Sequence, residues 1–190
     1  MSRPTVVVPD ALPAGVSIRP LDPHVDTRGK LVELYRVEWD TGCEAKQWNA
    51  VKSEANVLRG VHVHVRHTDY LTVLSGTMIL GLHDLRPESR TTGMSCMLRL
   101  GEEEPRAVMI PPGVCHGFFF PVPSIHIYAV SEYWDLRDEL GCRFDSGELL
   151  LEWPTTTPVL SERDRSAGTF TQMQKAFGRQ WLEFIKRTPE

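Results

Sequence analysis

The sequence predicts an all-β domain, a barrel or jelly roll, followed by one terminal α-helix. Fourteen glycines and fourteen prolines are scattered over the 190 residues, and short apolar or alternating runs lie between them from Val16 to about Val159. Runs of this length between turn residues are typical of β-strands rather than of a helical bundle. Hydrophobic residues make up 41% of the chain and charged residues 24%, which excludes disorder and a coiled coil.

The predicted strands are runs rich in Val, Ile, Leu and Tyr. They are LVELYRVEW (31–39), YLTVLSGTMILGL (70–82), AVMIP (107–111) and IHIYAVSEYW (125–134). Ser75-Gly76 predicts a tight hairpin inside the second run, and the sequence PPG at 111–113 predicts a turn into a further strand.

The last apolar residues follow a helical period instead. Between Gly168 and Pro189 they recur at Met173, Phe177, Trp181, Phe184 and Ile185. This spacing predicts an amphipathic helix that caps the barrel or contacts a dimer partner. We therefore expect a barrel over residues 1–165 and a helical tail over residues 166–190.

Charge and cysteine content narrow the class of protein further. The net charge is −4 and no basic stripe is present, which disfavours a nucleic-acid partner. The apolar run at 6–8 is too short for a signal peptide, and no run reaches membrane-spanning length. The four cysteines lie far apart without a CxxC pair, as reduced thiols do, so we expect a cytoplasmic protein without membrane contact.

Two histidines are two residues apart in a predicted strand. On a strand, His62 and His64 share one face, while the valines at 61, 63 and 65 take the other. Because an apolar barrel wall rarely holds two inward imidazoles, this pair indicates a ligand site. We expect the other histidines at the surface or at strand edges: His24, His67, His83 and His126.

Together with later residues, this pair resembles the two metal-binding motifs of the cupin superfamily. Asp69 follows His64 by five residues, at the position where the acid is usually glutamate, and His116 follows the turn PPGVC. The resemblance implies a cupin-type jelly roll. His62, His64, Asp69 and His116 would then suit a divalent metal such as Fe, Mn, Zn or Ni.

A second resemblance covers residues 26–164. Five blocks occur in order with similar gaps: DTRGKLVEL, QWNAVKSEANVLRGVH, LSGTMILGLHDLR, IPPGVCHGFFF, and the pair IYAVSEYW and LEWPTTTPVLSERD. These blocks resemble the dTDP-4-dehydrorhamnose 3,5-epimerase family, which is itself a cupin. This resemblance implies an isomerase of deoxysugar or polysaccharide biosynthesis. Its substrate would be a dTDP-4-keto-6-deoxyhexose-like nucleotide sugar, epimerised at C3, C5 or both.

The resemblance also implies roles for individual residues. His62 aligns with the catalytic base, Asp164 with its carboxylate partner and Tyr128 with the general acid on the other face of the sugar. The implied substrate-binding residues are Arg28, Glu33, Gln47, Asn49, Arg59, His116 and Arg163. Arginines at such positions bind phosphate bidentately. The family forms homodimers through N-terminal strands, so Arg28 is expected to reach the neighbour's site.

The chain departs from the family at four positions. Asp69 stands where the family has a lysine that stabilises the enolate, and His64 replaces a glutamine. An acidic position becomes Leu80, and an aromatic position becomes Leu31. A carboxylate at position 69 opposes the negative charge of an enolate.

Three hypotheses follow. In the preferred one, the chain is a cofactor-free epimerase in which a histidinium, His64 or His67, replaces the lysine. In the second, a divalent metal binds the four residues of the cupin motif. In the third, the chain binds a nucleotide sugar without catalysis.

Overall fold

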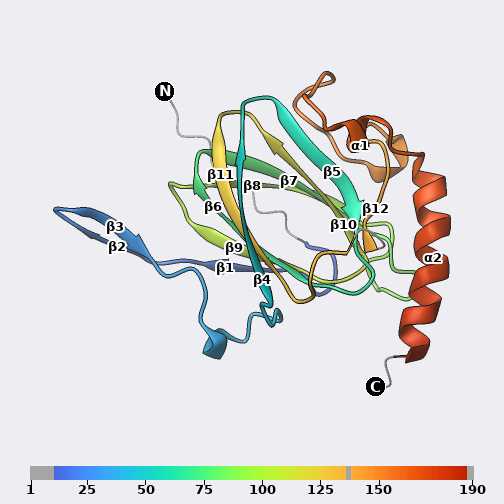
Figure 1. Cartoon of the computed structure of the whole chain (residues 1–190), viewed down its shortest axis with the longest axis horizontal. Coiled ribbons are helices and arrows are strands. Elements are labelled where there is room, and N and C mark those ends of the chain that lie inside the picture. Colours follow the sequence, from blue (N-terminus) through green and yellow to red (C-terminus); the bar gives the residue numbers. More distant parts are fainter. Residues whose placement is uncertain (1–10, 136–137, 188–190) are drawn as a thin grey trace.

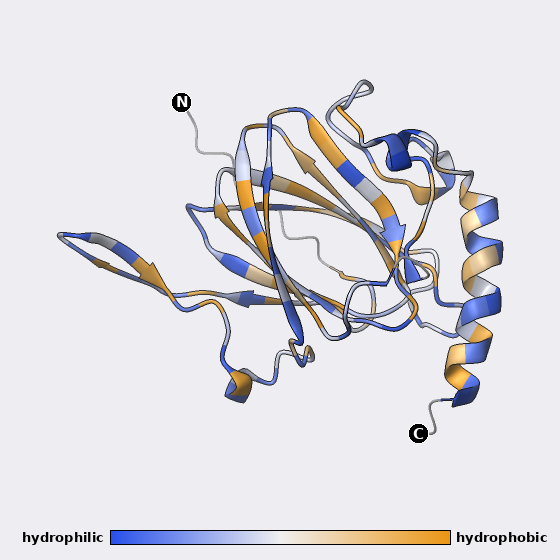
Figure 2. Ribbon diagram, viewed as in Figure 1, coloured by the Kyte–Doolittle hydropathy of each residue, from blue (hydrophilic) through white to orange (hydrophobic). Residues whose placement is uncertain are grey.

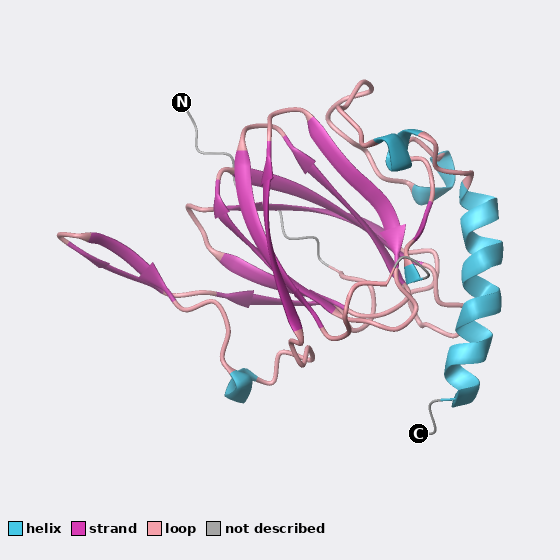
Figure 3. Cartoon of the chain, viewed as in Figure 1, coloured by secondary structure: helices cyan, strands magenta, loops and turns pink. Residues whose placement is uncertain are grey.

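Two five-stranded sheets form a jelly-roll barrel, with one long helix against the outside (Figures 1 and 3). The structure is a computed structural model and describes residues 11–135 and 138–187. The first sheet has the strand order β1-β9-β6-β11-β4 and the second β12-β5-β10-β7-β8. All ladders within these sheets are antiparallel.

The elements have these bounds. The first sheet contains β1 (Ser17–Pro20), β9 (Arg106–Ile110), β6 (Asp69–Ser75), β11 (Ser124–Val130) and β4 (Gln47–Ser53). The second contains β12 (Leu140–Gly141), β5 (Val57–Val63), β10 (Val114–Phe120), β7 (Thr77–Asp84) and β8 (Ser95–Gly101). A separate hairpin consists of β2 (Pro23–Asp26) and β3 (Gly29–Val32), and the helices are η1 (Val37–Trp39), η3 (Gly147–Leu149), α1 (Glu162–Arg165) and α2 (Phe170–Arg187).

The predicted β6–β7 hairpin is confirmed, and Gly76 occupies its turn. The φ of Gly76 is +82°, in the left-handed region. A Cβ at this position would lie 2.6 Å from the carbonyl oxygen of Pro123, so a larger residue does not fit. The turn at 111–113 also leads into β10, as the sequence predicted.

Two predicted strands are longer than those that form. Within 31–39, only β3 is extended, and η1 follows it, because β3 pairs only with the four residues of β2. Within 125–134, β11 ends at Val130. Both neighbouring strands begin opposite this residue, β4 at Gln47 and β6 at Asp69, so the ladder has no partners beyond it.

The space between the two sheets is filled by aliphatic side chains from both. Strand β8 alternates buried and partly exposed residues without a break, the pattern of a strand with one face in a core. The central cluster consists of residues from β6, β7, β8, β9 and β10 together with Val16. The main core therefore lies between the sheets.

Helix α2 covers the outer face of the second sheet and confirms the predicted tail helix. Its buried residues Phe170, Met173, Phe177 and Trp181 pack with Val61 and Val63 of β5 in one cluster. Figure 2 shows the helix with an orange face and a blue face, as an amphipathic helix has. The expected units of 1–165 and 166–190 include residues 1–10 and 188–190, which lie outside the described residues.

No helix in the described part of the chain is long and apolar enough to cross a membrane.

The packing of α2 makes a first prediction. Phe177 is 1% exposed, and its removal leaves a cavity behind the strand that carries His62. We expect Phe177→Ala to lower the free energy of unfolding by roughly 3–5 kcal/mol. Leu182, on the same helix but 55% exposed, is the control, and Leu182→Ala should cost less than about 0.5 kcal/mol. Urea unfolding measures both, and equal losses would contradict this packing.

A second prediction concerns the buried carboxylate of Asp84 at the end of β7. Burial alone raises its pKa, but hydrogen bonds from Arg86, Ser89 and Thr91 outweigh burial and lower the pKa below 3.8. Its stabilising effect is therefore complete well above pH 3.8 and is lost as the pH falls through the lowered pKa.

The variant Asp84→Asn should cost roughly 3 kcal/mol at neutral pH, because it leaves Arg86 without its buried partner. The difference from wild type should shrink as the pH falls through the lowered pKa of Asp84. Asp145→Asn breaks the exposed pair with Arg143 and should cost less than about 1 kcal/mol. A loss for Asp84→Asn that does not change with pH would contradict the assignment.

Candidate active site

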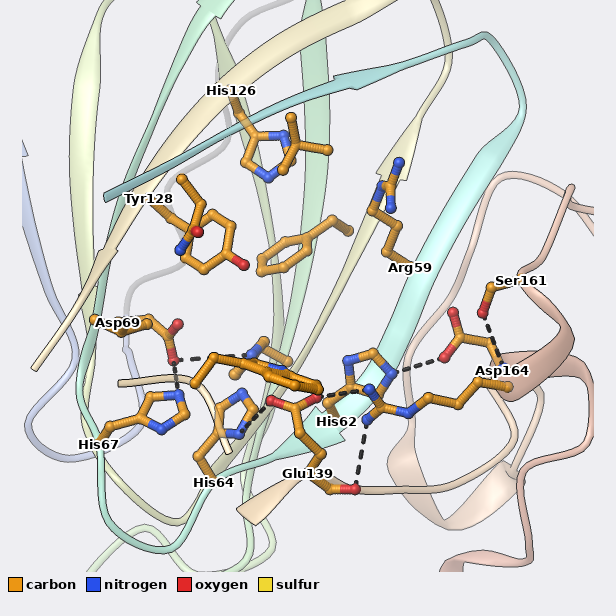
Figure 4. A pocket seen from close by; sticks show the side chains of 17 residues that line it. Arg59, His62, His64, His67, Asp69, His126, Tyr128, Glu139, Ser161 and Asp164 are labelled. Atoms are coloured by element: carbon orange, nitrogen blue, oxygen red, sulfur yellow. Dashed lines mark hydrogen bonds and ion pairs between the residues drawn. The ribbon is translucent and has the colours of Figure 1, made fainter. Parts of the chain in front are cut away.

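A pocket of about 250 Å³ opens between the sheets, and strands from both contribute to its wall (Figure 4). Its lining includes Asn49 of β4, His62 of β5, His116 of β10, Tyr128 of β11 and Asp164 of α1. Residues more than 100 positions apart in the sequence therefore meet at one site.

His62 is held by a carboxylate. Its Nε2 lies 2.7 Å from Oδ1 of Asp164. A carboxylate accepts a hydrogen bond, so Nε2 carries the proton, and Nδ1 is the ring nitrogen left for a substrate. The His62 side chain is 18% exposed, in contrast to the more deeply buried histidines nearby. This geometry suits a general base that is fixed in one tautomer.

Asp164 is positioned from two sides. Ser161 caps α1 by accepting a hydrogen bond from the backbone N–H of Asp164. The backbone N–H of Gly60 donates to its Oδ2 at 3.4 Å. Burial alone raises the pKa of Asp164, but the hydrogen bond from His62, the charge of His62 and the hydrogen bond from Gly60 together outweigh burial and lower the pKa. The ionised carboxylate can therefore stabilise a protonated His62.

Gly60 is required where β5 passes β10. Its φ is +111°, and a Cβ would lie 2.8 Å from the carbonyl oxygen of His116. The strands can therefore approach closely only with glycine at this position.

Tyr128 lies on another wall of the same pocket, on β11. Its neighbours across the ladders are Asn49 of β4 and Leu71 of β6. Burial, with the charges of Asp69 and Glu139, raises the pKa of its hydroxyl. The phenol therefore stays protonated at neutral pH and can donate a proton.

A cluster of buried histidines and carboxylates forms the floor of the pocket. The ring centroids of His64 and His67 are 3.9 Å apart, and those of His64 and His116 are 5.0 Å apart. The Asp69 carboxylate lies 3.7 Å from Nε2 of His67 and 3.9 Å from Nε2 of His116. Among the described residues, no group donates a hydrogen bond to this carboxylate.

Burial sets the charge of these groups. It lowers the pKa of His64 well below its usual value and that of His116 to about 3, so both imidazoles are neutral. Burial raises the pKa of Asp69 to about 7. Burial also opposes the charged form of His67, but its contacts with Asp138 and Asp69 outweigh this and raise its pKa. Of the two histidines expected to replace the lysine, His67 is the one whose environment favours a charge.

The structure brings together most of the predicted site residues. The pocket is lined by His62, Tyr128, Asp164, Asn49, Arg59, His116 and Arg163. Gln47 lies beside it, and its side-chain amide donates to Asn49 at 2.9 Å. Arg28 and Glu33 lie away from it, on and just after the β2–β3 hairpin, where they pair with Asp26 and Arg36.

The expectation for the remaining histidines is wrong in three cases. His24 is exposed, but His67, His83 and His126 are 3%, 4% and 1% exposed. His126 is on the same face of β11 as Tyr128 and stacks on Phe120. His83 points outward from β7, where the Ser95 hydroxyl bonds to its Nδ1 and α2 covers it.

Three residues in or beside the pocket were not predicted from the sequence. Trp134 and Glu139 line the wall, and Asp138 lies directly beneath it, bonded to the loop after β5. All three follow β11: Trp134 is the last residue of the predicted strand 125–134, and residues 135–139 show no strand or helix periodicity. The only available signal was the density of acidic residues near position 138.

Comparisons with known proteins identify the family of this chain. The model of the family described as dTDP-4-dehydrorhamnose 3,5-epimerase matches residues 11–172. The dTDP-4-dehydrorhamnose 3-epimerase of Streptomyces niveus is 33% identical over 155 residues, 76% of this chain and 74% of that protein. The spore coat polysaccharide biosynthesis protein SpsL of Bacillus subtilis is 30% identical over 145 residues, 74% of this chain and 96% of its own.

Solved structures share the fold. NovW, a 4-keto-6-deoxy sugar epimerase from the novobiocin gene cluster of Streptomyces spheroides, has a TM-score of 0.81 at 28% identity. The match covers 90% of this chain and 91% of NovW. The dTDP-4-dehydrorhamnose 3,5-epimerase of Bacillus anthracis, solved with TDP and PPi bound, has a TM-score of 0.77 at 28% identity and covers 87% of this chain and 100% of its own.

The order of motifs in the sequence and the cupin-type jelly roll agree with these matches. The expected fold and enzyme class, an isomerase, are confirmed: this chain belongs to the dTDP-4-dehydrorhamnose 3,5-epimerase family.

Proposed function

We propose that this chain epimerises a dTDP-4-keto-6-deoxyhexose-like nucleotide sugar at C3, C5 or both, in deoxysugar or polysaccharide biosynthesis. The observation that carries the proposal is the His62–Asp164 hydrogen bond of 2.7 Å, in a pocket that also contains Tyr128. The names of the relatives support the substrate class, because they include 3-epimerases and 3,5-epimerases of dTDP-4-dehydrorhamnose.

The first step is the removal of a proton from a carbon beside the keto group. Such a proton is acidic only if the resulting enolate is stabilised and the base is correctly placed. In this role Nδ1 of His62 takes the proton, and Asp164 stabilises the imidazolium that forms.

The second step returns a proton to the opposite face of the same carbon. Tyr128 is the donor in this proposal, because its raised pKa keeps the phenol protonated until the enolate forms. A proton taken by His62 and a proton given by Tyr128 invert the configuration at that carbon.

Polar groups around these residues support a sugar-nucleotide ligand. Arg59 and Arg163 line the pocket and present guanidinium groups suited to a diphosphate. In addition, Nδ2 of Asn49 and Nδ1 of His126 are buried without a hydrogen-bond partner among the described residues. Such atoms are costly unless a ligand bonds to them.

The proposal includes a homodimer. The β2–β3 hairpin extends away from the barrel (Figure 1), and Val25 and Leu31 on it are 74% and 62% exposed. Contact with a second copy would cover these side chains and would bring Arg28 and Glu33 to the partner's pocket.

We also propose a cytoplasmic location. The four cysteines, Cys43, Cys96, Cys115 and Cys142, are buried and unpaired, as is typical of a reducing compartment.

The catalytic roles can be separated by solvent-deuterium exchange. In D₂O with a dTDP-4-keto-6-deoxyhexose, His62→Asn should reduce deuterium uptake by roughly 10²- to 10⁴-fold. Tyr128→Phe should reduce formation of the inverted sugar by about 10²-fold or more, while exchange at the face of His62 continues. NMR of the sugar gives the position and configuration of the label.

The exposed histidine variant His24→Gln is the control and should behave as wild type. Normal uptake in His62→Asn would overturn its role as base. A correctly folded wild type that binds the nucleotide sugar but takes up no deuterium would show the non-catalytic alternative to be right.

The dimer can be tested by mixing inactive subunits. If Arg28 serves the partner's pocket, a heterodimer of His62→Asn and Arg28→Ala chains has one pocket with both residues intact. We expect activity to appear on mixing and to exceed that of either variant alone. Sedimentation of wild type should give a dimer at micromolar concentration, and a monomer would contradict the arrangement.

A further inference from the structure

We propose that His64, Asp69 and His116 bind one divalent transition-metal ion in the floor of the pocket. One ligand atom from each of these three residues lies within 4.8 Å of the others. Two imidazole nitrogens and one carboxylate oxygen form a donor set that suits Zn²⁺, Mn²⁺ or Fe²⁺ and leaves positions open for water or substrate.

The two imidazoles are oriented as metal ligands. Nδ1 of His64 lies 3.2 Å from the backbone oxygen of Asp138, and Nδ1 of His116 lies 3.3 Å from that of Val114. A carbonyl oxygen can only accept, so Nδ1 carries the proton in both rings and Nε2 carries the lone pair. A second hydrogen bond of this kind is the usual support of a metal-bound histidine.

The third ligand, Asp69, has His67 as a charged neighbour, 3.7 Å from its carboxylate, but it lacks a hydrogen-bond donor among the described residues. It is 5% exposed, and no described residue donates a hydrogen bond to its carboxylate. Burial without a hydrogen-bond donor disfavours an ionised carboxylate, and a cation bound directly to its oxygens would compensate its charge. Figure 4 shows Asp69 beside the histidines, pointing toward them.

A neighbouring group of similar composition does not share this property. His64, His67 and Asp138 also lie within 4.8 Å of one another. However, the Asp138 carboxylate already accepts hydrogen bonds from the backbone N–H groups of Val65 and Arg66 and lies 3.3 Å from Nδ1 of His67. The Asp138 oxygens therefore hold the loop after β5 in place. His64, His67 and Asp138 form a structural cluster beneath the proposed metal site.

The proposed site differs from the set of four residues considered from the sequence. His62 belongs to neither group of potential ligands, and its Nε2 is bonded to Asp164. An ion at His64, Asp69 and His116 therefore leaves His62 free to act as the base. One pocket can hold both the ion and the base, so the metal and epimerase hypotheses do not exclude each other.

A catalytic role for the ion rests on the proposed function, whereas ion binding does not. In an epimerase, the ion would act as a Lewis acid on the keto oxygen of the sugar and would stabilise the enolate. Asp69 without a cation would oppose that negative charge. With the ion bound, the charge of Asp69 is compensated, and the site as a whole is positive and can stabilise the enolate.

The experiment uses protein purified without an affinity tag and stripped with a chelator. Calorimetric titration with Zn²⁺ should show one ion per chain, and Co²⁺ should give the visible absorption of a site with nitrogen and oxygen ligands. Asp69→Asn and His64→Gln should each weaken Zn²⁺ binding by more than about 100-fold. His62→Asn and the exposed His24→Gln should bind as wild type, and circular dichroism confirms that each variant is folded.

Two results would overturn the metal site: no stoichiometric binding by the folded wild type, or wild-type affinity in both Asp69→Asn and His64→Gln. Deuterium exchange in stripped and Zn²⁺-loaded protein tests the role in catalysis separately. Full exchange in stripped protein would overturn the Lewis-acid role and leave the epimerase intact. Tight Zn²⁺ binding without exchange in any state would leave the site intact and overturn the proposed function.

Discussion

The two-residue alternation along β5 is the constraint on which the rest of the structure depends. Val61 and Val63 point outward and pack under α2, and this places His62 between them on the pocket side. A shift of one residue would bury the histidine under the helix and turn the valines into the pocket. The packing energy of the helix therefore also fixes the position of the proposed base.

The pocket combines groups whose burial is unfavourable alone. Asp164 is ionised because His62 and the backbone N–H of Gly60 donate hydrogen bonds to its carboxylate. Asp69 is deeply buried without such donors, and burial raises its pKa to about 7. Two carboxylates that line the same pocket thus differ in pKa because of their hydrogen bonds. Asp164 is therefore suited to be the partner of a base, whereas Asp69 is a candidate metal ligand.

Much of the fold followed from local patterns. The turn at Gly76, the strand after Gly113 and the helix with Phe177 and Trp181 were all predicted, because glycine conformation and helical periodicity are local properties. Strand ends were predicted less well. Val130 ends β11 because β4 and β6 begin opposite it, and this depends on residues distant in sequence.

Site residues that belong to family motifs were predicted from the sequence. Residues that tertiary contacts bring to the pocket were missed. His62, Tyr128 and Asp164 were found through resemblance to a family, and all three line one pocket. His67 and His126 were expected at the surface, because no local pattern indicates that a loop or a face is covered by other segments. The contact of Asp138 with the loop after β5 likewise joins segments more than 70 residues apart.

The most direct test of the central claim is the tautomer of His62. Heteronuclear NMR of ¹⁵N-histidine-labelled protein, at about pH 8.5 where a free imidazole is neutral, reports which ring nitrogen carries the proton. The structure predicts that Nε2 of His62 is protonated and that Asp164→Asn abolishes this preference. A His62 protonated on Nδ1, or one unaffected by Asp164→Asn, would contradict its assignment as the carboxylate-held base.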